Sequence, residues 1–238
     1  MCKMLRGQSI KLFVIVMLVS LTVEIYSITY KADEVWNTPL VLDQLPSDGM
    51  QALQQWIDVA KSKLGERDAT TMVLATVSSD NKPYSRAMMA KSIDKEGLVI
   101  YGNKESVKFQ QLQEKPFASI TFYWPALQRQ LTIRGCAVQV SDAEAKAYFA
   151  TRSKSSQMAS WASSQGRPLK KYEQLINKYK EIEAQYRGRE IVAPTYWVGY
   201  RIVPTDIELW QAGVNTLHER VLYQKDVKGK WTKMYLYP

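Results

Sequence analysis

Apolar and polar positions along this chain follow two different periods, and the change of period marks the predicted elements. Apolar residues recur at helical spacing between Met50 and Leu64, which predicts a helix with one face on a core and Ser47 or Asp48 as its N-cap. Residues 71–78 and 84–91 are instead rich in apolar and β-branched side chains. Turn-forming residues at 79–83 separate them, so this region predicts two strands.

Short strands continue through the rest of the chain. They are predicted at 98–101, 118–124, 130–140, 197–202, 206–210, 220–224 and 231–236. Helices are predicted at 104–114, at 141–151 after a capping box, and at 169–186, with a helical turn at 158–161. Residues 152–157 and 163–167 are predicted to be loops. About eight strands with three or four helices predict a mainly β fold with flanking helices, of the sandwich or barrel type.

The first 32 residues differ from everything that follows. Lys3, Arg6 and Lys11 precede an apolar run at 12–23, which Glu24 ends. The run is shorter than the roughly 20 residues that a membrane span needs, and its basic start resembles a signal peptide. We therefore divide the chain into a leader, 1–32, and a domain, 33–238. The leader suggests export or membrane anchoring, and a start codon placed too far upstream is the remaining alternative.

Composition narrows the class of protein. A formal net charge of +9 favours anionic partners such as phosphorylated small molecules, nucleic acid or a membrane surface. Two cysteines and one histidine exclude a disulfide scaffold and argue against a metal site, so no metal is expected. The sequence contains no G-x-S-x-G, P-loop or G-x-G-x-x-G motif, which argues against a serine hydrolase, a kinase and a classical nicotinamide dehydrogenase.

The single histidine, His218, lies in the stretch of greatest chemical interest. Strand-like runs flank a break at Ala212 and Gly213, and polar and aromatic residues surround the histidine. A lone histidine among polar neighbours is most often an ordinary surface residue. Loops between rigid strands, however, are where binding and catalytic residues concentrate, so this stretch is a candidate site.

Ordered motifs across the chain give this stretch a context. They are R-x-x-x-x-K at 86–91, Y-x-N at 101–103, R-Q at 129–130, Y-F-x-x-R at 148–152, S-Q-x-x-x-W at 156–161, P-x-x-W at 194–197, W-Q-x-G at 210–213 and L-H-E-R-x-x-Y at 217–223. Each motif alone is weak, but their joint order and spacing are specific. From about Leu53 to Pro238 the chain resembles the pyridoxamine (pyridoxine) 5′-phosphate oxidases.

The resemblance implies a fold, a cofactor and a reaction. The family fold is an FMN-binding split barrel, a homodimer with the flavin at the subunit interface. The implied reaction oxidises pyridoxine or pyridoxamine 5′-phosphate to pyridoxal 5′-phosphate. A hydride leaves C4′ of the substrate for N5 of the flavin, and dioxygen reoxidises the flavin with release of hydrogen peroxide. The expected partners are thus a phosphorylated B6 vitamer and a second copy of the chain, with no nucleic acid and with membrane contact only through a retained leader.

The resemblance also assigns residues to roles. Flavin contacts are expected from Arg86, Lys91, Tyr101, Lys108, Gln130, Gln165, Trp210 and Arg220. Substrate contacts are expected from Lys91, Tyr148, Arg152, Ser156 and His218. His218 and Arg220 are the expected catalytic pair. Guanidinium and ammonium groups suit phosphate because they bind it through charge-assisted hydrogen bonds, and hydroxyl groups add further donors.

Three positions depart from the family pattern. Thr216 and Val107 stand where the family has arginines that contact the substrate and the flavin phosphate, and Gly166 stands where a serine is common. Each lost charge-assisted contact costs roughly 1.5–3 kcal/mol, or one to two decades in binding. Arg134 and Lys104 are candidates to replace the missing charges.

Two other functions stay open at this point. The departures allow a split-barrel protein that binds pyridoxal 5′-phosphate or flavin with little or no turnover. The basic charge and aromatic residues such as Tyr123 and Trp124 allow a β-barrel that binds single-stranded nucleic acid. These aromatic residues lie in apolar strand patterns, which favours a place in the core and argues against the nucleic-acid binder.

Overall fold

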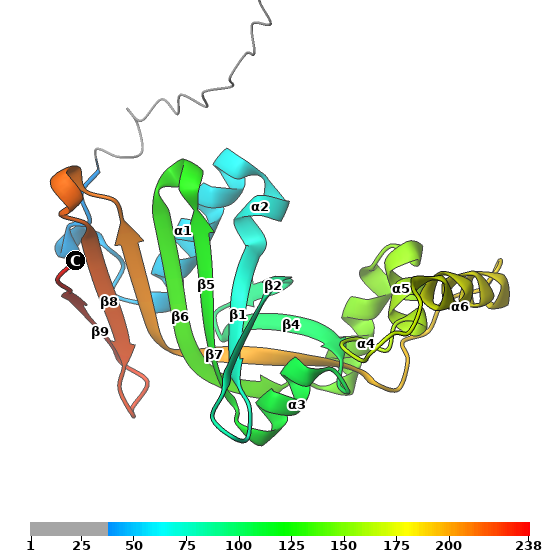
Figure 1. Cartoon of the computed structure of the whole chain (residues 1–238). Helices are drawn as coiled ribbons and strands as arrows, with labels where there is room; N and C mark the ends of the chain where they lie inside the picture. Colours follow the sequence, from blue (N-terminus) through cyan, green and yellow to red (C-terminus); the bar gives the residue numbers. More distant parts are fainter. Residues whose placement is uncertain (1–37) are drawn as a thin grey trace, which may run out of the picture. The chain divides into compact units, whose positions relative to one another are not determined.

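The computed structural model describes residues 38–238, so the leader lies outside the described residues. The strands are β1 Thr71–Val77, β2 Pro83–Met89, β3 Ser92–Asp94, β4 Gly97–Asn103, β5 Phe117–Trp124, β6 Arg129–Gln139, β7 Trp197–Gln211, β8 Glu219–Lys225 and β9 Trp231–Tyr235. The helices are α1 Gly49–Leu64, α2 Glu66–Thr70, α3 Val107–Glu114, α4 Asp142–Thr151, α5 Lys154–Ala162 and α6 Tyr172–Gln185. The predicted mainly β fold with flanking helices is confirmed (Figure 1).

One antiparallel sheet holds all of these strands. Its order is β2-β1-β5-β6-β7-β4-β3, and β8 pairs with β7 and β9. Strand β7 is the axis of the sheet, because β6 runs along one edge of it while β4 and β8 share the other edge in succession. The start of β7 therefore lies beside β4, and its end lies beside β8.

Strand β7 stays continuous across a proline through a β-bulge. The register with β6 shifts between Arg134 and Gly135, and Thr205 is left opposite no residue. A Cβ at Gly135 would lie 2.1 Å from the carbonyl oxygen of Val203, so the close approach requires glycine. Pro204 lacks an N–H, and bulges are where a sheet tolerates proline. The sequence analysis predicted two strands here, which was wrong.

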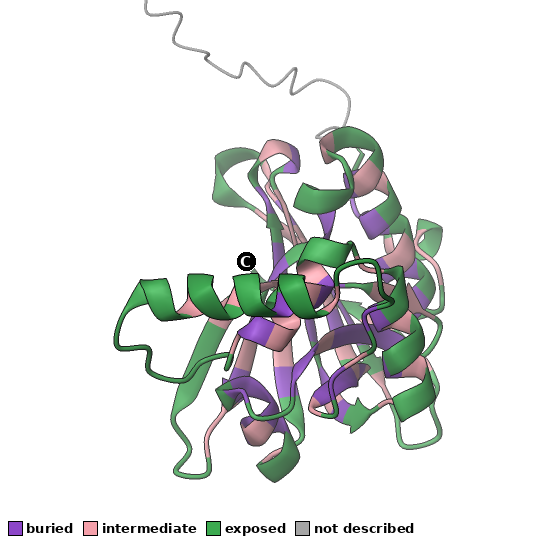
Figure 2. Ribbon diagram, turned by 90° about the vertical axis from the view of Figure 1, so that its right-hand side faces the viewer, coloured by how far each residue is buried: buried purple, intermediate pink, exposed green. Residues whose placement is uncertain are grey.

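Two cores support the sheet. The larger one joins the inward side of the strands to α1, whose N-cap Asp48 accepts hydrogen bonds from the backbone N–H groups of Met50 and Gln51. The smaller core joins α4 to the start of β7 through Phe149 and Trp197. Figure 2 shows buried residues where sheet and helices meet and exposed residues on the outer sides of the helices. Within 38–238, no helix is both long and apolar enough to span a bilayer.

The boundaries of several elements differ from the prediction. Residues 154–162 form α5, although most of 152–157 was predicted to be a loop, because Ser153 caps the helix by accepting from the backbone N–H of Ser156. Helix α6 begins at Tyr172 and not at Leu169, and α2 and β3 were not predicted. Trp124 is buried in the core as expected, whereas Tyr123 is 59% exposed, so its predicted place in the core was wrong.

Candidate active site

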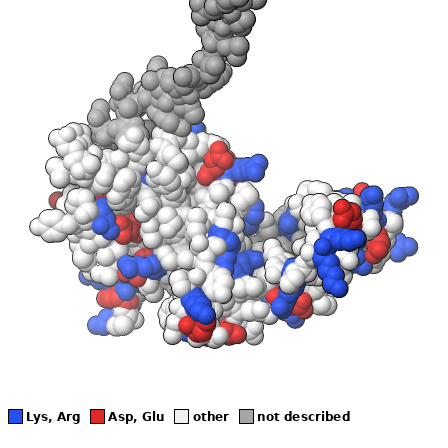
Figure 3. Space-filling model, in the orientation of Figure 1, with Lys and Arg blue, Asp and Glu red and all other residues white. Residues whose placement is uncertain are grey.

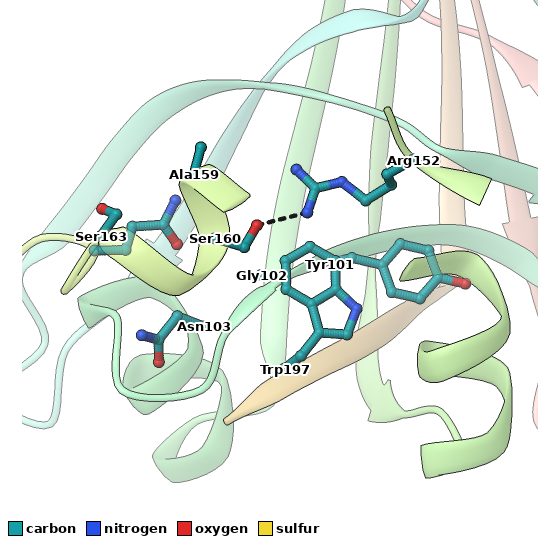
Figure 4. Close-up of a pocket in the computed structure, with 9 residues that line it drawn as sticks. Tyr101, Gly102, Asn103, Arg152, Ala159, Ser160, Ser163 and Trp197 are labelled. Carbon is teal, nitrogen blue, oxygen red and sulfur yellow. Dashed lines mark hydrogen bonds between the residues drawn. The ribbon is translucent and has the colours of Figure 1, made fainter. Parts of the chain in front are cut away.

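A cavity of about 280 Å³ opens where β4, α5 and the start of β7 meet (Figure 4). Its lining residues are Tyr101, Gly102, Asn103, Arg152, Ala159, Ser160, Ser163, Gln165 and Trp197. The cavity lies beside the smaller core, in which the indole Nε1 of Trp197 donates to the carbonyl oxygen of Ala145 at 3.1 Å. Packing of α4 on the start of β7 thus gives the cavity a fixed wall.

Arg152 is the cation of this cavity. Its guanidinium lies over the ring of Trp197, 4.6 Å from the centroid, and its Nη1 donates to the hydroxyl oxygen of Ser160 at 2.6 Å. Burial lowers the pKa of Arg152 from its ordinary value. The stacked indole and the Ser160 bond hold the guanidinium in place, and the remaining N–H donors are available to an anion.

The other predicted substrate residues gather around Arg152. Burial, and then the charge of Arg152, lower the pKa of Lys91, so the two cations are close enough to interact. The ring of Tyr148 stacks on that of Tyr101 with centroids 4.0 Å apart. Ser156 lies one helical turn before Ser160, which donates to its carbonyl oxygen at 3.0 Å. The structure therefore brings these predicted residues together at one place.

A second group of predicted residues lies at the neighbouring wall. The ammonium group of Lys108 donates to the Gln165 Oε1 at 2.6 Å and to the Ser106 hydroxyl oxygen at 3.1 Å. Lys108 is only 7% exposed. Burial, and then the charge of Arg86, lower its pKa to about 8. Arg86 in turn donates to the Thr76 hydroxyl oxygen at 2.6 Å.

Gly102 connects this second group to the cavity. A Cβ at this position would lie 2.8 Å from the ring of Phe109, 3.3 Å from the Gln165 Oε1 and 3.6 Å from the Lys108 Nζ. The bare backbone of β4 therefore passes close to both polar groups. Gln165 belongs to both sets, because it lines the cavity and accepts from Lys108.

A third group lies at the opposite end of β7. Gln130 on β6 pairs with Trp210, which pairs with Arg220 on β8. The rings of Trp210 and His218 have centroids 4.8 Å apart, and His218 Nδ1 accepts from the backbone N–H of Gly213 at 3.3 Å. A neutral ring that accepts at Nδ1 carries its proton on Nε2. Arg220 forms an ion pair with Glu208 at 2.8 Å.

The third group is remote from the cavity within one chain. Trp197 lines the cavity and Trp210 contacts His218, and the two tryptophans are thirteen positions apart on one strand. At about 3.3 Å per residue this is roughly 43 Å of strand. The cavity lining includes no residue beyond Trp197. One chain therefore joins Lys91, Tyr148, Arg152 and Ser156, but it does not bring His218 or Arg220 to them.

Comparison with known proteins identifies the family. The family model described as pyridoxamine 5′-phosphate oxidase matches residues 61–186. A pyridoxine/pyridoxamine 5′-phosphate oxidase of Zymomonas mobilis is 40% identical over 194 residues, which cover 82% of this chain and 100% of that protein. The chain belongs to the pyridoxamine 5′-phosphate oxidase family. A second relative of the same name, from Myxococcus xanthus, is 38% identical over 82% of this chain and 93% of its own.

Solved structures of this oxidase family share the fold. PhzG from Burkholderia lata, crystallised with tetrahydrophenazine-1-carboxylic acid, superposes with a TM-score of 0.78 at 31% identity, over 84% of this chain and 99% of its own. A Nostoc punctiforme protein described as pyridoxamine 5′-phosphate oxidase-related and FMN binding gives a TM-score of 0.64 at 17% identity, over 79% and 96%. The expected split-barrel fold is confirmed.

A second family model divides the oxidase fold at an informative point. It is described as the pyridoxine 5′-phosphate oxidase C-terminal dimerisation region, and it matches residues 197–238. That segment carries Trp210, His218 and Arg220, whereas the residues gathered around Arg152 lie almost entirely in the first model. The boundary between the two family models thus falls near the division between the residues around Arg152 and the group that contains His218.

The departures from the oxidase pattern lie at two places. A Cβ at Gly166 would lie 3.9 Å from the backbone nitrogen of Val107, so these two positions are neighbours beside Lys108. Thr216 lies in the loop before His218 with φ 62°, a left-handed conformation that strains a β-branched residue. Arg134, one of the candidates to replace a missing charge, is paired with Asp206 at 3.3 Å.

Sequence reasoning missed several residues of this site. Ser160 binds Arg152, Gln111 accepts from Arg86 at 3.4 Å, and Glu208 pairs with Arg220. Trp197 was quoted only as part of the P-x-x-W motif, although it forms the floor under Arg152. The P-x-x-W motif could have identified Trp197, whereas no motif or spacing in the sequence indicates the residues that contact the arginines.

Proposed function

We propose that this chain is an FMN-dependent oxidase that converts pyridoxamine or pyridoxine 5′-phosphate to pyridoxal 5′-phosphate. One observation carries the proposal. Arg152 lines the cavity, Lys91 interacts with Arg152, and Lys108 with Arg86 lies behind the lining residue Gln165. None of these four cations takes part in the ion pairs found between residues 38 and 238. Lys108 is buried and Arg86 and Arg152 are partly buried, and cations in such places without an ion-pair partner are costly unless an anion joins them. Two phosphate groups, one on the flavin and one on the substrate, would supply it.

FMN fits the wall formed by Lys108, Arg86 and Gln165. Lys108 has only neutral partners, Ser106 and Gln165, and would hold the flavin phosphate with the help of Arg86. The bare backbone at Gly102 leaves room for a flat ring system to approach β4. When bound, FMN would supply the redox chemistry, as acceptor of a hydride from C4′ of the substrate and donor of two electrons to dioxygen, which would yield hydrogen peroxide. With pyridoxamine 5′-phosphate, water enters and ammonia leaves.

The substrate phosphate would bind on the α4–α5 side of the cavity. Arg152 offers a guanidinium held over Trp197, Lys91 adds a second charge, and Tyr148 and Ser156 add hydroxyl groups. Charge-assisted hydrogen bonds of this kind orient a ligand as well as bind it, so the reacting carbon would face the flavin. His218 and Arg220 would contact the substrate ring.

The proposed site needs a second copy of the chain, since His218 and Arg220 lie far from Arg152 within one chain. The description of the C-terminal family model supports a homodimer. The outward side of the sheet supports it physically, with Val73, Phe117 and Tyr123 exposed by 46%, 63% and 59%. Figure 3 shows that the area over β5 and β6 carries few charged side chains. An uncovered apolar sheet face of this kind marks an interface.

The experiment that tests this function is direct. Purified protein is expected to be yellow and to release hydrogen peroxide when given pyridoxamine 5′-phosphate, because the flavin remains bound and turns over. Visible absorption and a peroxide assay measure the two properties. A colourless protein that FMN does not reconstitute would contradict the proposal.

The alternative is a split-barrel protein that binds flavin or pyridoxal 5′-phosphate with little turnover. Val107 and Thr216 favour it, because both leave an uncharged side chain where the family has an arginine. The same assay separates the two functions. Yellow protein that binds the vitamer but releases no peroxide would select the alternative.

The buried lysine gives the flavin site a pH dependence. The pKa of Lys108 is about 8 in the folded chain. Below that value the ammonium form is present and FMN affinity is flat. Above it, binding the anion requires proton uptake, so affinity is expected to fall by up to about tenfold per pH unit. Fluorescence titration of FMN between about pH 7 and pH 9.5 measures this, and Lys108→Arg should flatten the curve, because arginine keeps its charge. Equal slopes in both proteins would show that Lys108 is not the group responsible.

A further inference from the structure

Arg201 on β7 is the centre of an acidic cluster outside the cavity. Its Nη1 donates to both carboxylate oxygens of Asp94 at 2.5 Å, and its Nη2 donates to the Glu144 Oε1 at 3.2 Å. Glu96 lies 3.5 Å away. The Arg201 side chain is only 15% exposed. The arginine therefore connects β3, the turn that follows it and helix α4 at one point.

The cluster reaches the cavity through helix α4. Glu144 lies in the first turn of α4, one turn before Tyr148, so both side chains project from the same face of the helix. Tyr148 stacks on Tyr101 with an interplanar angle of 10°, and Tyr101 lines the cavity. Loss of the Glu144 side chain would therefore displace the stacked tyrosines more than any other part of the cavity.

Tyr101 is fixed from its other side by β7. A Cβ at Gly199 would lie 2.6 Å from the Tyr101 ring, so the ring rests on bare backbone two residues before Arg201, on the same side of the strand. Figure 4 shows the Tyr101 hydroxyl pointing away from the cavity. Burial, and then the charges of Glu144 and Tyr148, raise the pKa of this hydroxyl to about 12, so the phenol stays protonated.

We propose that Arg201 and Glu144 are positioning residues for the phosphate site. Asp94 holds the Arg201 guanidinium, Arg201 holds the Glu144 carboxylate, and Glu144 thereby fixes the first turn of α4, from which Tyr148 stacks on Tyr101. Tyr148 and the Arg152 that follows α4 are thereby kept at the distance that the substrate phosphate requires. This inference rests on the proposed function, because it names the residues that support the same site from behind.

Geometry favours positioning over a purely structural ion pair. Arg201 is held by three carboxylates from two segments, the β3–β4 hairpin and α4, which is more than is needed to keep one strand in place. By contrast, α4 is anchored to the core independently, through the Trp197 bond to Ala145 and the packing of Phe149. Removing the Glu144 charge should therefore leave the fold intact while it loosens the tyrosine pair.

The test compares Glu144→Gln, Arg201→Met and Arg201→Lys with the wild type as FMN-loaded enzymes. Glu144→Gln and Arg201→Met are expected to raise KM for pyridoxamine 5′-phosphate about tenfold, the effect of one charged hydrogen bond. The inhibition constant of inorganic phosphate should rise in parallel, with kcat within about twofold of wild type because the reacting carbon and flavin are untouched. Arg201→Lys should recover part of the loss, because a lysine keeps the charge but not the planar fork.

Lys178→Met is the matched control, since it removes an exposed ion pair with Glu181 on α6. It should change neither constant. Unchanged KM and phosphate inhibition in Glu144→Gln would overturn the positioning role, as would a loss of kcat and bound FMN at constant KM. If the wild type proves inactive, the proposed function fails separately. Calorimetric binding of inorganic phosphate to the same variants then decides between an intact and a loosened phosphate site.

Discussion

Replacing Arg152 with methionine is expected to raise KM for pyridoxamine 5′-phosphate about a hundredfold with a smaller change in kcat. Loss of a hydrogen bond to a charged group costs roughly 1.5–3 kcal/mol, and each 1.4 kcal/mol is a factor of ten. The upper end applies here, because Arg152 is partly buried and lies over Trp197 and beside Lys91, where water screens the interaction poorly. Methionine preserves much of the packing on the indole, so the fold should persist. Steady-state kinetics of the FMN-loaded enzyme gives both constants.

The exposed Arg189, after α6, provides the control for charge alone. Arg189→Met removes one positive charge from the same helical region, so its kinetic constants should match the wild type. Equal shifts of KM in both variants would contradict direct binding of the substrate phosphate by Arg152, because the effect would then be long-range electrostatic attraction. It would fail if Arg152→Met left KM unchanged.

Mixed dimers are expected to restore activity to two defective variants. Arg152→Met impairs the cavity, and Arg220→Met impairs the group near His218 at the other end of β7. In a two-fold dimer whose sites combine both ends, a mixed dimer has one site with both defects and one intact site. Dimers that carry one chain of each, isolated with two affinity tags, should therefore show about half of the wild-type activity per dimer.

The pair Lys91→Met and Arg152→Met supplies the matched control. Both residues belong to the group around Arg152, so each site of the mixed dimer keeps one defect and activity should stay as low as in the parent variants. Recovery in both mixtures would point to exchange or contamination. Absence of recovery with Arg152→Met and Arg220→Met would contradict a site shared between two chains.

The sequence predicted helices and strands correctly where a capping residue, a turn or the spacing of apolar residues alone determines the element. The apolar spacing of α1 and the Asp48 cap, and the turn between β1 and β2, are properties of neighbouring residues. Strand β7 was divided wrongly at Pro204, because the missing N–H is tolerated only by virtue of the bulge against Gly135 on another strand. Helix α5 was missed because its cap, Ser153, stands in a run of serines and lysines that is typical of a loop.

The sequence predicted which residues belong to the candidate site, but not how far apart they lie within one chain. The motifs assigned Arg152 and His218 to one function, yet nothing in their spacing shows that roughly 43 Å of strand separates their surroundings within one chain. Tertiary pairing decided this, since β7 continues as one strand along the whole of β6. The partners of the arginines, such as Glu208 and Ser160, are single contacts between distant segments, and local periodicity does not encode them.

The four cations that form no ion pair also lower the conformational stability of the ligand-free chain. Arg86 and Lys108 lie close enough for mutual repulsion, and Lys91 and Arg152 do likewise. An occupied site relieves this repulsion, so ligand binding adds directly to conformational stability. Flavin supply would then control how much of the protein persists as well as how much is active, because unliganded chains unfold more often and are exposed to proteolysis.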